Sequence, residues 1–206
     1  MEIIIQRDGA AACLYAARFM AAVIRRQQHS VLGLATGSTP EKVYAELVRM
    51  HRDEGLNFGG VSTFNLDEYV GLDPSHAGSY RYYMDRHLFS RVNLPRTATH
   101  FPDGMAKDLV AECRHYEESI RKAGGIDLQL LGIGRDGHIG FNEPTSSLSS
   151  RTRIKTLTEQ TIRDNSPHFG PGEKVPFHVL TMGIGTILEA RAALLLAFGE
   201  SKADAV

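Results

Sequence analysis

The sequence contains little cysteine and no hydrophobic run long enough to cross a membrane. Its two cysteines, Cys13 and Cys113, belong to no CxxC motif, and neither stands at zinc spacing from a histidine. A disulfide scaffold and a structural zinc site are therefore excluded, and we expect two buried thiols in a reducing cytoplasm. No basic, cleavable leader follows Met1, so we expect a chain that is neither exported nor membrane-spanning.

An excess of charge of either sign is also missing. Lys and Arg (23) balance Asp and Glu (24), which leaves a formal net charge of -1. We therefore expect neither nucleic acid nor an anionic membrane as a partner, and any anionic ligand must be held locally. No internal repeat, low-complexity tract or Ser/Pro-rich linker divides residues 1–206, so we expect one domain.

Short apolar or β-branched runs alternate with longer segments of helical periodicity. The runs predict strands at residues 2–5, 31–34, 61–66, 126–132, 153–157, 177–182 and 193–198. Near-continuous apolar runs such as LQLL and ALLLAF indicate strands that are covered on both faces. The sequence therefore predicts an α/β fold of three layers, with a doubly wound, mostly parallel, Rossmann-like sheet.

The segments between the strands predict helices and one flap. In residues 105–123 apolar side chains recur at helical spacing, and the pattern stops at Gly124. Another helix is expected to begin at Pro40 with Thr39 as its N-cap. The polar, Ser/Thr-rich segment 146–174 ends in GPGEK and is predicted to be a mobile flap over a site.

The first candidate loop is VLGLATGSTP, residues 31–40, where a strand passes through small residues into the start of a helix. Free N–H groups and the helix dipole at such a point favour an anion, for example a phosphate monoester. No Gly-Lys-Ser/Thr follows, so the loop is not a Walker A motif. An ordinary strand-to-helix turn capped by Thr39 is an equally good interpretation of the spacing.

The second candidate loop, DEYVGLDP, follows the run VSTFNL. It places Asp67 and Glu68 at the carboxyl end of a strand, which is where open α/β sheets bind ligands. A partly desolvated carboxylate there can take a proton from a carbon next to a carbonyl. Considered alone, this loop is more often a solvated acidic turn.

The third candidate loop, GIGRDGHIGFNEP, places Asp136, His138 and Glu143 close together after a buried strand. Its GxGxxG does not predict a dinucleotide site, because Pro144 follows without helical periodicity. Two carboxylates around one imidazole favour its protonated form and fix its tautomer, so His138 is predicted to transfer protons. No HxH, HExxH or calcium-loop spacing is present, and we expect no metal.

Taken together, LATGSTP, TFNLDEYVGL, GIGRDGHIGFNEP and SSLSSRTRIKTLT resemble, in the same order, motifs of the glucosamine-6-phosphate deaminase family. The resemblance spans nearly the whole chain. It implies an enzyme, classed here as a hydrolase, that converts D-glucosamine 6-phosphate and water into D-fructose 6-phosphate and ammonia. The implied reaction is an aldose-ketose isomerisation that expels the amine, with no metal or organic cofactor.

The resemblance also implies roles for single residues. Asp67 would be the base that moves a proton from C2 toward C1, and His138 would open the sugar ring. Asp136 and Glu143 would hold and charge that imidazole. The phosphate would be bound by three backbone amides and one lysine near the chain end: Gly37, Ser38, Thr39 and Lys202.

A second set of residues resembles an allosteric site. Ser147, Arg153 and Lys155 match positions that bind the activator N-acetylglucosamine 6-phosphate at a subunit interface in hexameric members of the family. Such a site requires a homo-oligomer, and the residues leave the oligomeric state open. The alternative is a basic, exposed strand without a ligand.

Two features depart from the family pattern. The sequence reads NSPHF where the family has an arginine in its flap, so Pro167 stands in place of that arginine and His168 or Arg163 would have to substitute for it. After the strand 193–198 the chain has only one short helical turn, and we expect the C-terminal elements of the domain to be missing.

Two other functions fit the same motifs. A 6-phosphogluconolactonase-like hydrolase needs a base that activates water but abstracts no proton from C2. A sugar-phosphate sensor needs the binding residues without turnover, although such sensors are usually fused to a helix-turn-helix. The residues also leave open whether glucosamine or galactosamine is preferred.

Overall fold

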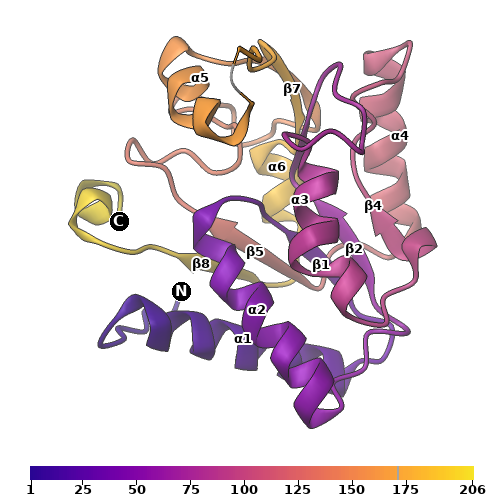
Figure 1. Ribbon diagram of the computed structural model, residues 1–206, viewed down its shortest axis with the longest axis vertical. Coiled ribbons are helices and arrows are strands. Elements are labelled where there is room, and N and C mark those ends of the chain that lie inside the picture. Colours follow the sequence, from indigo (N-terminus) through magenta and orange to yellow (C-terminus); the bar gives the residue numbers. More distant parts are fainter. Residues whose placement is uncertain (171) are drawn as a thin grey trace.

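A five-stranded parallel sheet forms the centre of the computed structural model, which describes residues 1–170 and 172–206 (Figure 1). All four of its strand pairings are parallel. From one edge to the other the strands are β4 (Thr99–His100), β2 (Ser62–Asn65), β1 (Val31–Leu34), β5 (Leu128–Gly132) and β8 (Ala193–Leu196). Four of the seven predicted strands therefore belong to this sheet.

Helices cover both faces of the sheet and complete three layers (Figure 1). On one face, Leu32 and Leu34 of β1 pack in an apolar cluster with α1 (Gly9–Arg26) and α2 (Ser38–Glu54). On the other face, Val31 of β1 packs in a cluster with Tyr116 of α4 (Leu109–Lys122). Alternate residues of one strand thus enter opposite cores. The predicted α/β, doubly wound, Rossmann-like fold is confirmed.

A smaller antiparallel sheet was not foreseen. It consists of β3 (Asp67–Tyr69), β7 (His178–Thr181) and β6 (Arg153–Thr156), with β7 in the middle. The sequence analysis placed the runs 153–157 and 177–182 in a mostly parallel sheet, and for these two runs that placement was wrong. A short apolar run indicates a strand but does not indicate which strand it pairs with, because pairing depends on contacts distant in sequence.

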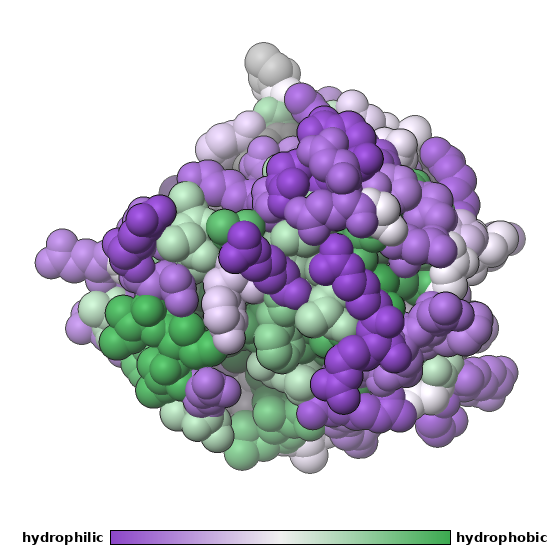
Figure 2. All heavy atoms as spheres, turned by 90° about the horizontal axis from the view of Figure 1, so that it is seen from below, coloured by the Kyte–Doolittle hydropathy of each residue, from purple (hydrophilic) through white to green (hydrophobic). Residues whose placement is uncertain are grey.

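The predicted strand at residues 2–5 is absent from the structure. Ile3 and Ile5 are 72% and 90% exposed, and no strand of the described chain pairs with this segment. Without a partner strand its backbone gains no ladder hydrogen bonds, so β propensity alone does not make a strand. Viewed from the side of α1 and α2, the surface carries a gathering of hydrophobic residues, drawn in green, among polar ones (Figure 2).

The helices begin and end close to their predicted limits. Asp108 caps α4 by accepting hydrogen bonds from two N–H groups of its first turn, and Gly124 follows the helix with a φ of 90°, as a glycine stop requires. α2 begins at Ser38 with Gly37 as its N-cap, so the prediction that Thr39 is the N-cap was wrong. The shorter helices are α3 (Tyr80–His87), α5 (Glu159–Asn165) and α6 (Ile184–Leu188).

The structure also bears on the predictions for the cysteines, for membrane-spanning helices and for the flap. Cys13 and Cys113 are buried and unpaired, as predicted. Across the described ranges, no helix combines the length and apolarity needed to cross a membrane. The predicted flap 146–174 contains β6 and α5. Its mobility stays a prediction, and Pro171 within it lies outside the described residues.

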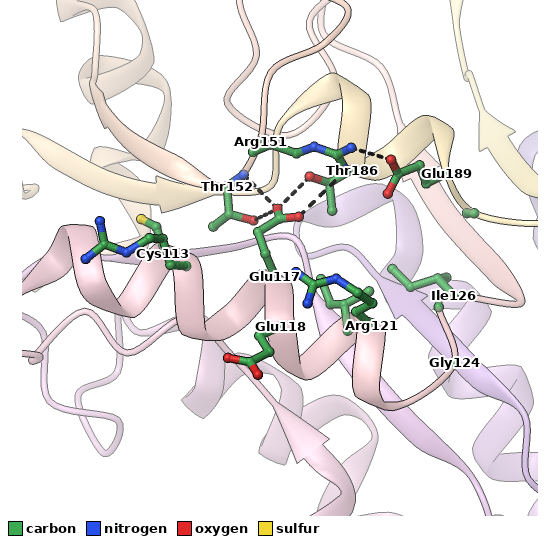
Figure 3. Close-up of a pocket in the computed structure, with 14 residues that line it drawn as sticks. Cys113, Glu117, Glu118, Arg121, Gly124, Ile126, Arg151, Thr152, Thr186 and Glu189 are labelled. Atoms are coloured by element: carbon green, nitrogen blue, oxygen red, sulfur yellow. Dashed lines mark hydrogen bonds and ion pairs between the residues drawn. The ribbon is translucent and has the colours of Figure 1, made fainter.

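Glu117 of α4 joins this helix to the second sheet and to α6 (Figure 3). Its Oε1 accepts hydrogen bonds from the N–H and the hydroxyl of Thr152, at 2.8 and 2.5 Å, and from the hydroxyl of Thr186 at 2.6 Å. The Glu117 side chain is only 16% exposed. Beside it is an open hollow of about 860 Å³, and Arg151 at its rim pairs with Glu189.

We predict that Glu117→Ala lowers the free energy of unfolding by about 2 kcal/mol or more, because three donors lose a charged acceptor. Urea denaturation measures the change. Glu118→Ala is the matched control, since Glu118 is half exposed, pairs only with Lys122, and should change stability by less than about 0.5 kcal/mol. Equal effects of the two substitutions would contradict the assignment of Glu117 as a structural joint.

Candidate active site

The three candidate loops meet at one edge of the central sheet. β1 lies between β2 and β5 and is parallel to both, so the segments that follow these strands leave the sheet at the same carboxyl edge. A methyl group on Gly132 would lie 4.0 Å from Cβ of Thr39, and one on Gly140 would lie 3.2 Å from Oδ1 of Asp67. The third loop therefore contacts both of the others.

Asp67 is buried at this edge, with 6% of its surface exposed. It begins β3 and pairs with Thr181 of β7. Burial raises the pKa of Asp67 to about 7, and the charge of Glu68 adds to the rise, while the Thr181 hydroxyl and the Phe141 N–H act in the opposite direction. The alternative of a solvated acidic turn was wrong. A carboxyl with this pKa can exchange a proton near neutral pH.

Glu68 has a structural role that the sequence analysis did not find. Its carboxylate is buried at the start of α3, where it accepts hydrogen bonds from the N–H groups of Tyr80 and Arg81 and from the hydroxyl of Ser79. Further along α3, the hydroxyl of Tyr83 donates to the carbonyl oxygen of Gly37 at 2.7 Å. The second loop is thus connected to the first through one capped helix.

His138 is held by Asp136, as the spacing predicted. Nδ1 of His138 lies 2.6 Å from Oδ1 of Asp136, and the His138 N–H donates to the same oxygen at 3.2 Å. The imidazole stands against Gly134, where a methyl group would come within 2.3 Å of the ring. Glycine at this position is therefore what leaves room for the ring.

Glu143 completes the group. Asp136, His138 and Glu143 each offer a ligand atom, and these atoms lie within 4.8 Å of one another. Burial raises the pKa of Glu143, and its hydrogen bond with Asp136 raises it further. Burial also tends to raise the pKa of Asp136, but the hydrogen bonds from His138 and Glu143 outweigh this effect. The pKa of Asp136 is therefore lowered. Two acids thus share one imidazole with unequal proton affinities.

The same three side chains offer the oxygen and nitrogen ligands that a divalent metal accepts. The sequence predicts no metal here, and this stays a prediction.

The first loop provides a helix N-terminus without a side-chain cap. Gly37 precedes α2 with a φ of 107°, and among the described residues no side chain caps the first turn of α2. By contrast, the long helices α1 and α4 are capped by Asp8 and Asp108. The N–H groups of Ser38 and Thr39 are therefore free of a capping side chain, as an anion site requires.

Lys202, the fourth predicted phosphate ligand, lies in the C-terminal 3-10 helix Glu200–Ala205 (Figure 1). Within the described chain no hydrogen bond or ion pair joins the Lys202 side chain to the turn formed by residues 37–39. Its role in phosphate binding stays a prediction.

The residues of the predicted allosteric site lie on and before β6. Arg153 and Lys155 share one face of β6, and both are partly buried. The Arg153 guanidinium reaches the hydroxyl of Ser146 at 3.4 Å, whereas the hydroxyl of Ser147 contacts that of Ser149. A wholly exposed basic strand is therefore not what the structure contains.

Pro167 stands where the family has an arginine in its flap, and of the two residues expected to substitute for it, only the side chain of Arg163 is described. Arg163 forms an ion pair with Glu159 and donates a hydrogen bond to Gln160, both within α5. The side chain of His168 lies outside the described part of the chain. Substitution of the family arginine by either residue stays a prediction.

The hollow beside Glu117 (Figure 3) is separate from this edge of the sheet, since none of the predicted site residues lines it. Its arginines and glutamates are balanced and partly paired with one another. We take the candidate site from the converging side chains at the sheet edge instead.

Proton transfer near neutral pH needs groups that accept and donate protons, and this edge offers them next to a turn suited to an anion. The fold and the site thus define an α/β protein of the enzyme type, with proton-transfer groups beside a turn suited to an anion. The chain belongs to the family described as glucosamine-6-phosphate isomerases/6-phosphogluconolactonase, whose profile matches residues 8–206.

Relatives named glucosamine-6-phosphate deaminase match the whole chain. Those of Shewanella loihica and of an Arthrobacter species are each 54% identical over 206 residues, and the chain spans 77% and 79% of their lengths. A solved monomeric glucosamine-6-phosphate deaminase is 45% identical, with a TM-score of 0.96 over all of this chain and 85% of that one.

A 6-phosphogluconolactonase from Thermotoga maritima shares the fold, with a TM-score of 0.73 at 21% identity over 98% of this chain and 85% of the other. At that identity the likeness concerns the fold alone. The names of the close relatives and of the family support a deaminase and isomerase, rather than the hydrolase class expected from the sequence.

We predict that Asp67→Asn stabilises the protein at about pH 8 and not at about pH 4. The folded protein keeps the Asp67 proton up to about pH 7, whereas the unfolded chain releases it near 3.8, so the stability of the wild type falls as the pH rises between these values. A difference of about 3 pKa units corresponds to at most about 4 kcal/mol.

Urea denaturation at both pH values measures this effect. Asp204→Asn is the control, because Asp204 is exposed in the C-terminal 3-10 helix and should show no such gain. A variant at position 67 that is no more stable than the wild type at the higher pH would mean that the carboxyl is not held in a costly environment.

Proposed function

We propose that this chain is a glucosamine-6-phosphate deaminase, which converts D-glucosamine 6-phosphate and water into D-fructose 6-phosphate and ammonia. One observation carries the proposal: a buried carboxyl, Asp67, whose pKa is raised to about 7, lies against Gly140 of the loop that holds His138. The full-length similarity to relatives of that name supports the same reaction.

Binding of the phosphate would set the position of the sugar. The free N–H groups of Ser38 and Thr39 at the start of α2 would donate hydrogen bonds to the phosphate oxygens, with Lys202 as a further ligand. The sugar would then extend across the sheet edge toward the third loop. Gly37 keeps this approach open, because nothing lies within 4 Å of the position that a side-chain carbon would occupy there.

Proton transfers would follow at two side chains. His138, oriented by Asp136 and Glu143, would pass a proton to the ring oxygen and open the sugar. Ionised Asp67 would take the proton from C2 while the ammonium group of the substrate gives a proton to the aldehyde oxygen at C1, which leaves an enolamine with a C1=C2 double bond. Asp67 would then deliver its proton to C1, and the double bond shifts to lie between C2 and nitrogen. Water then adds at C2, and the C–N bond breaks with its electron pair leaving on nitrogen, so that ammonia is released. Each acid or base contributes about 10²- to 10⁴-fold in rate.

Release of ammonia from glucosamine 6-phosphate tests the proposal. We expect the wild type to release ammonia, and Asp67→Asn to lose about 10²-fold or more in kcat with little change in KM, because it keeps the shape of the site but removes the base. Asp204→Asn, at an exposed site, should behave as the wild type. Undiminished release by the position-67 variant would reject Asp67 as the base.

Deuterium exchange separates the other two functions. In D2O the deaminase incorporates solvent deuterium into the sugar, whereas hydrolysis of a 6-phosphogluconolactone leaves C2 without exchange. Lactone hydrolysis in the absence of exchange would favour the lactonase. Binding of the sugar phosphate with neither exchange nor turnover would favour a sensor.

A second prediction concerns the imidazole. Gly134→Ala would place a methyl group against the His138 ring and displace it from Asp136, so we expect kcat to fall by about 10²-fold or more while the fold is kept. Gly9→Ala is the matched control, since its methyl group would meet the Phe198 ring at an ordinary 3.7 Å. A fully active position-134 variant would show that the ring does not need its observed position.

We also propose that the enzyme acts in the cytoplasm, in keeping with its two unpaired thiols. An activator site at Ser147, Arg153 and Lys155 requires a homo-oligomer, because the site is completed at a subunit interface in regulated members. Light scattering measures the oligomeric state. If the protein is a monomer, like the solved relative described as monomeric, it has no subunit interface at which this site could be completed. Activation by N-acetylglucosamine 6-phosphate would support it.

A further inference from the structure

Thr181 lies beside Asp67 in the interior of the antiparallel sheet. It is the residue of β7 that pairs with Asp67 on one side and with Arg153 of β6 on the other. Directly paired residues of an antiparallel sheet present their side chains on the same face. Thr181 is fully buried.

The hydroxyl of Thr181 has few partners. Its oxygen accepts a hydrogen bond from the Phe141 N–H at 3.3 Å, and its single proton is donated to the carbonyl oxygen of Met182 at 3.4 Å. Oδ1 of Asp67 is buried and has no hydrogen-bond partner within the described residues, so it is the other acceptor within this group. A methyl group on Gly140 would lie 3.2 Å from Oδ1 of Asp67 and 3.4 Å from Oγ1 of Thr181. The carboxylate, the hydroxyl and the third loop therefore meet at one point.

These contacts make the direction of the Thr181 hydroxyl depend on the charge of its neighbour. An ionised carboxylate is a stronger acceptor than a carbonyl, so the proton of Thr181 points to Asp67 when that residue is ionised. When Asp67 is protonated, the carbonyl of Met182 is the better acceptor. The Phe141 N–H donates to the hydroxyl oxygen, which strengthens the hydroxyl as a donor, and it also lowers the pKa of Asp67 directly.

We propose that Thr181 is the positioning residue of the base. Its hydroxyl orients the Asp67 carboxylate, favours the ionised form, and links the base to the third loop through the Phe141 N–H. The inference rests on the proposed function for its catalytic consequence, but the contact itself can be tested without turnover. It adds a residue to the site that no motif of the sequence indicates.

Other groups near Asp67 do not supply this function. Glu68 repels the negative charge of Asp67 and raises its pKa. Three tyrosines, Tyr69, Tyr80 and Tyr116, have pKa values raised mainly by burial and stay neutral at the pH values used here. On β6, Arg153 lies across Thr181 from Asp67, and its guanidinium reaches Ser146.

The test compares Thr181→Val, which replaces the hydroxyl with a methyl group, with Thr181→Ser, which keeps it. For Thr181→Val we expect the rise of kcat/KM with pH to move about one pH unit upward, because a hydrogen bond that favours the ionised form is lost. At about pH 7 this lowers kcat/KM by about 10-fold, and the loss shrinks at higher pH. Thr181→Ser should retain the wild-type profile.

A second readout needs no turnover. The stability of the wild type falls as the pH rises and levels off near the pKa of Asp67 in the folded protein; Thr181→Val should move this upper limit upward by the same amount and leave the start of the fall unchanged. In the Asp67→Asn background the same substitution should leave the pH dependence unchanged, because the titrating group is gone. This background also separates a specific effect from general damage to the core.

The outcomes distinguish the two proposals. An active wild type with the same pH profile in Thr181→Val overturns the positioning role and leaves the deaminase intact. A wild type that releases no ammonia rejects the deaminase, while the stability measurement still decides whether Thr181 governs Asp67. If Thr181→Val fails to fold, Thr181→Ser and Thr181→Ala supply the comparison, and a profile in Thr181→Ala equal to that of Thr181→Ser also overturns the role.

Discussion

The burial of the Asp67 carboxyl is the constraint on which the site depends. A carboxylate with 6% of its surface exposed pays a desolvation cost unless its surroundings hold it, and its raised pKa is the result of that cost. The surroundings come from two segments far apart in sequence, Thr181 of β7 and the Gly140–Phe141 backbone. The same burial that destabilises the charge lets the carboxyl exchange a proton near neutral pH.

A second carboxylate, Glu68, shows how adjacent residues of one strand serve different purposes. Its side chain lies on the opposite face of β3 from that of Asp67, because successive residues of a strand alternate. It accepts hydrogen bonds from the N–H groups at the start of α3. α3 then carries Tyr83 to the carbonyl of Gly37, next to the N-terminus of α2. The turn at Gly37 is therefore connected to β3 by hydrogen bonds through Glu68 and α3.

Short sequence patterns correctly predicted those features that depend on contacts between residues close together in the sequence. The His138 loop could be predicted because Asp136 is only two positions away and its carboxylate reaches the ring without help from distant elements. The strands β1 and β5 and the glycine stop of α4 follow for the same reason, since burial on both faces and a left-handed stop are visible in short runs. The segment 2–5 has the same apolar signal but no partner strand, and there the prediction failed.

The sequence by itself determined the α/β class, the three loops that form the site and the chemical character of their side chains, because these depend on residue type and short spacing. Only the tertiary structure decided that Asp67 belongs to an antiparallel sheet, that Thr181 lies against it, and that Glu68 caps a helix. Such pairings join residues up to 114 positions apart, as Asp67 and Thr181 are. Their energies come from packing and desolvation, which no local pattern of residues encodes.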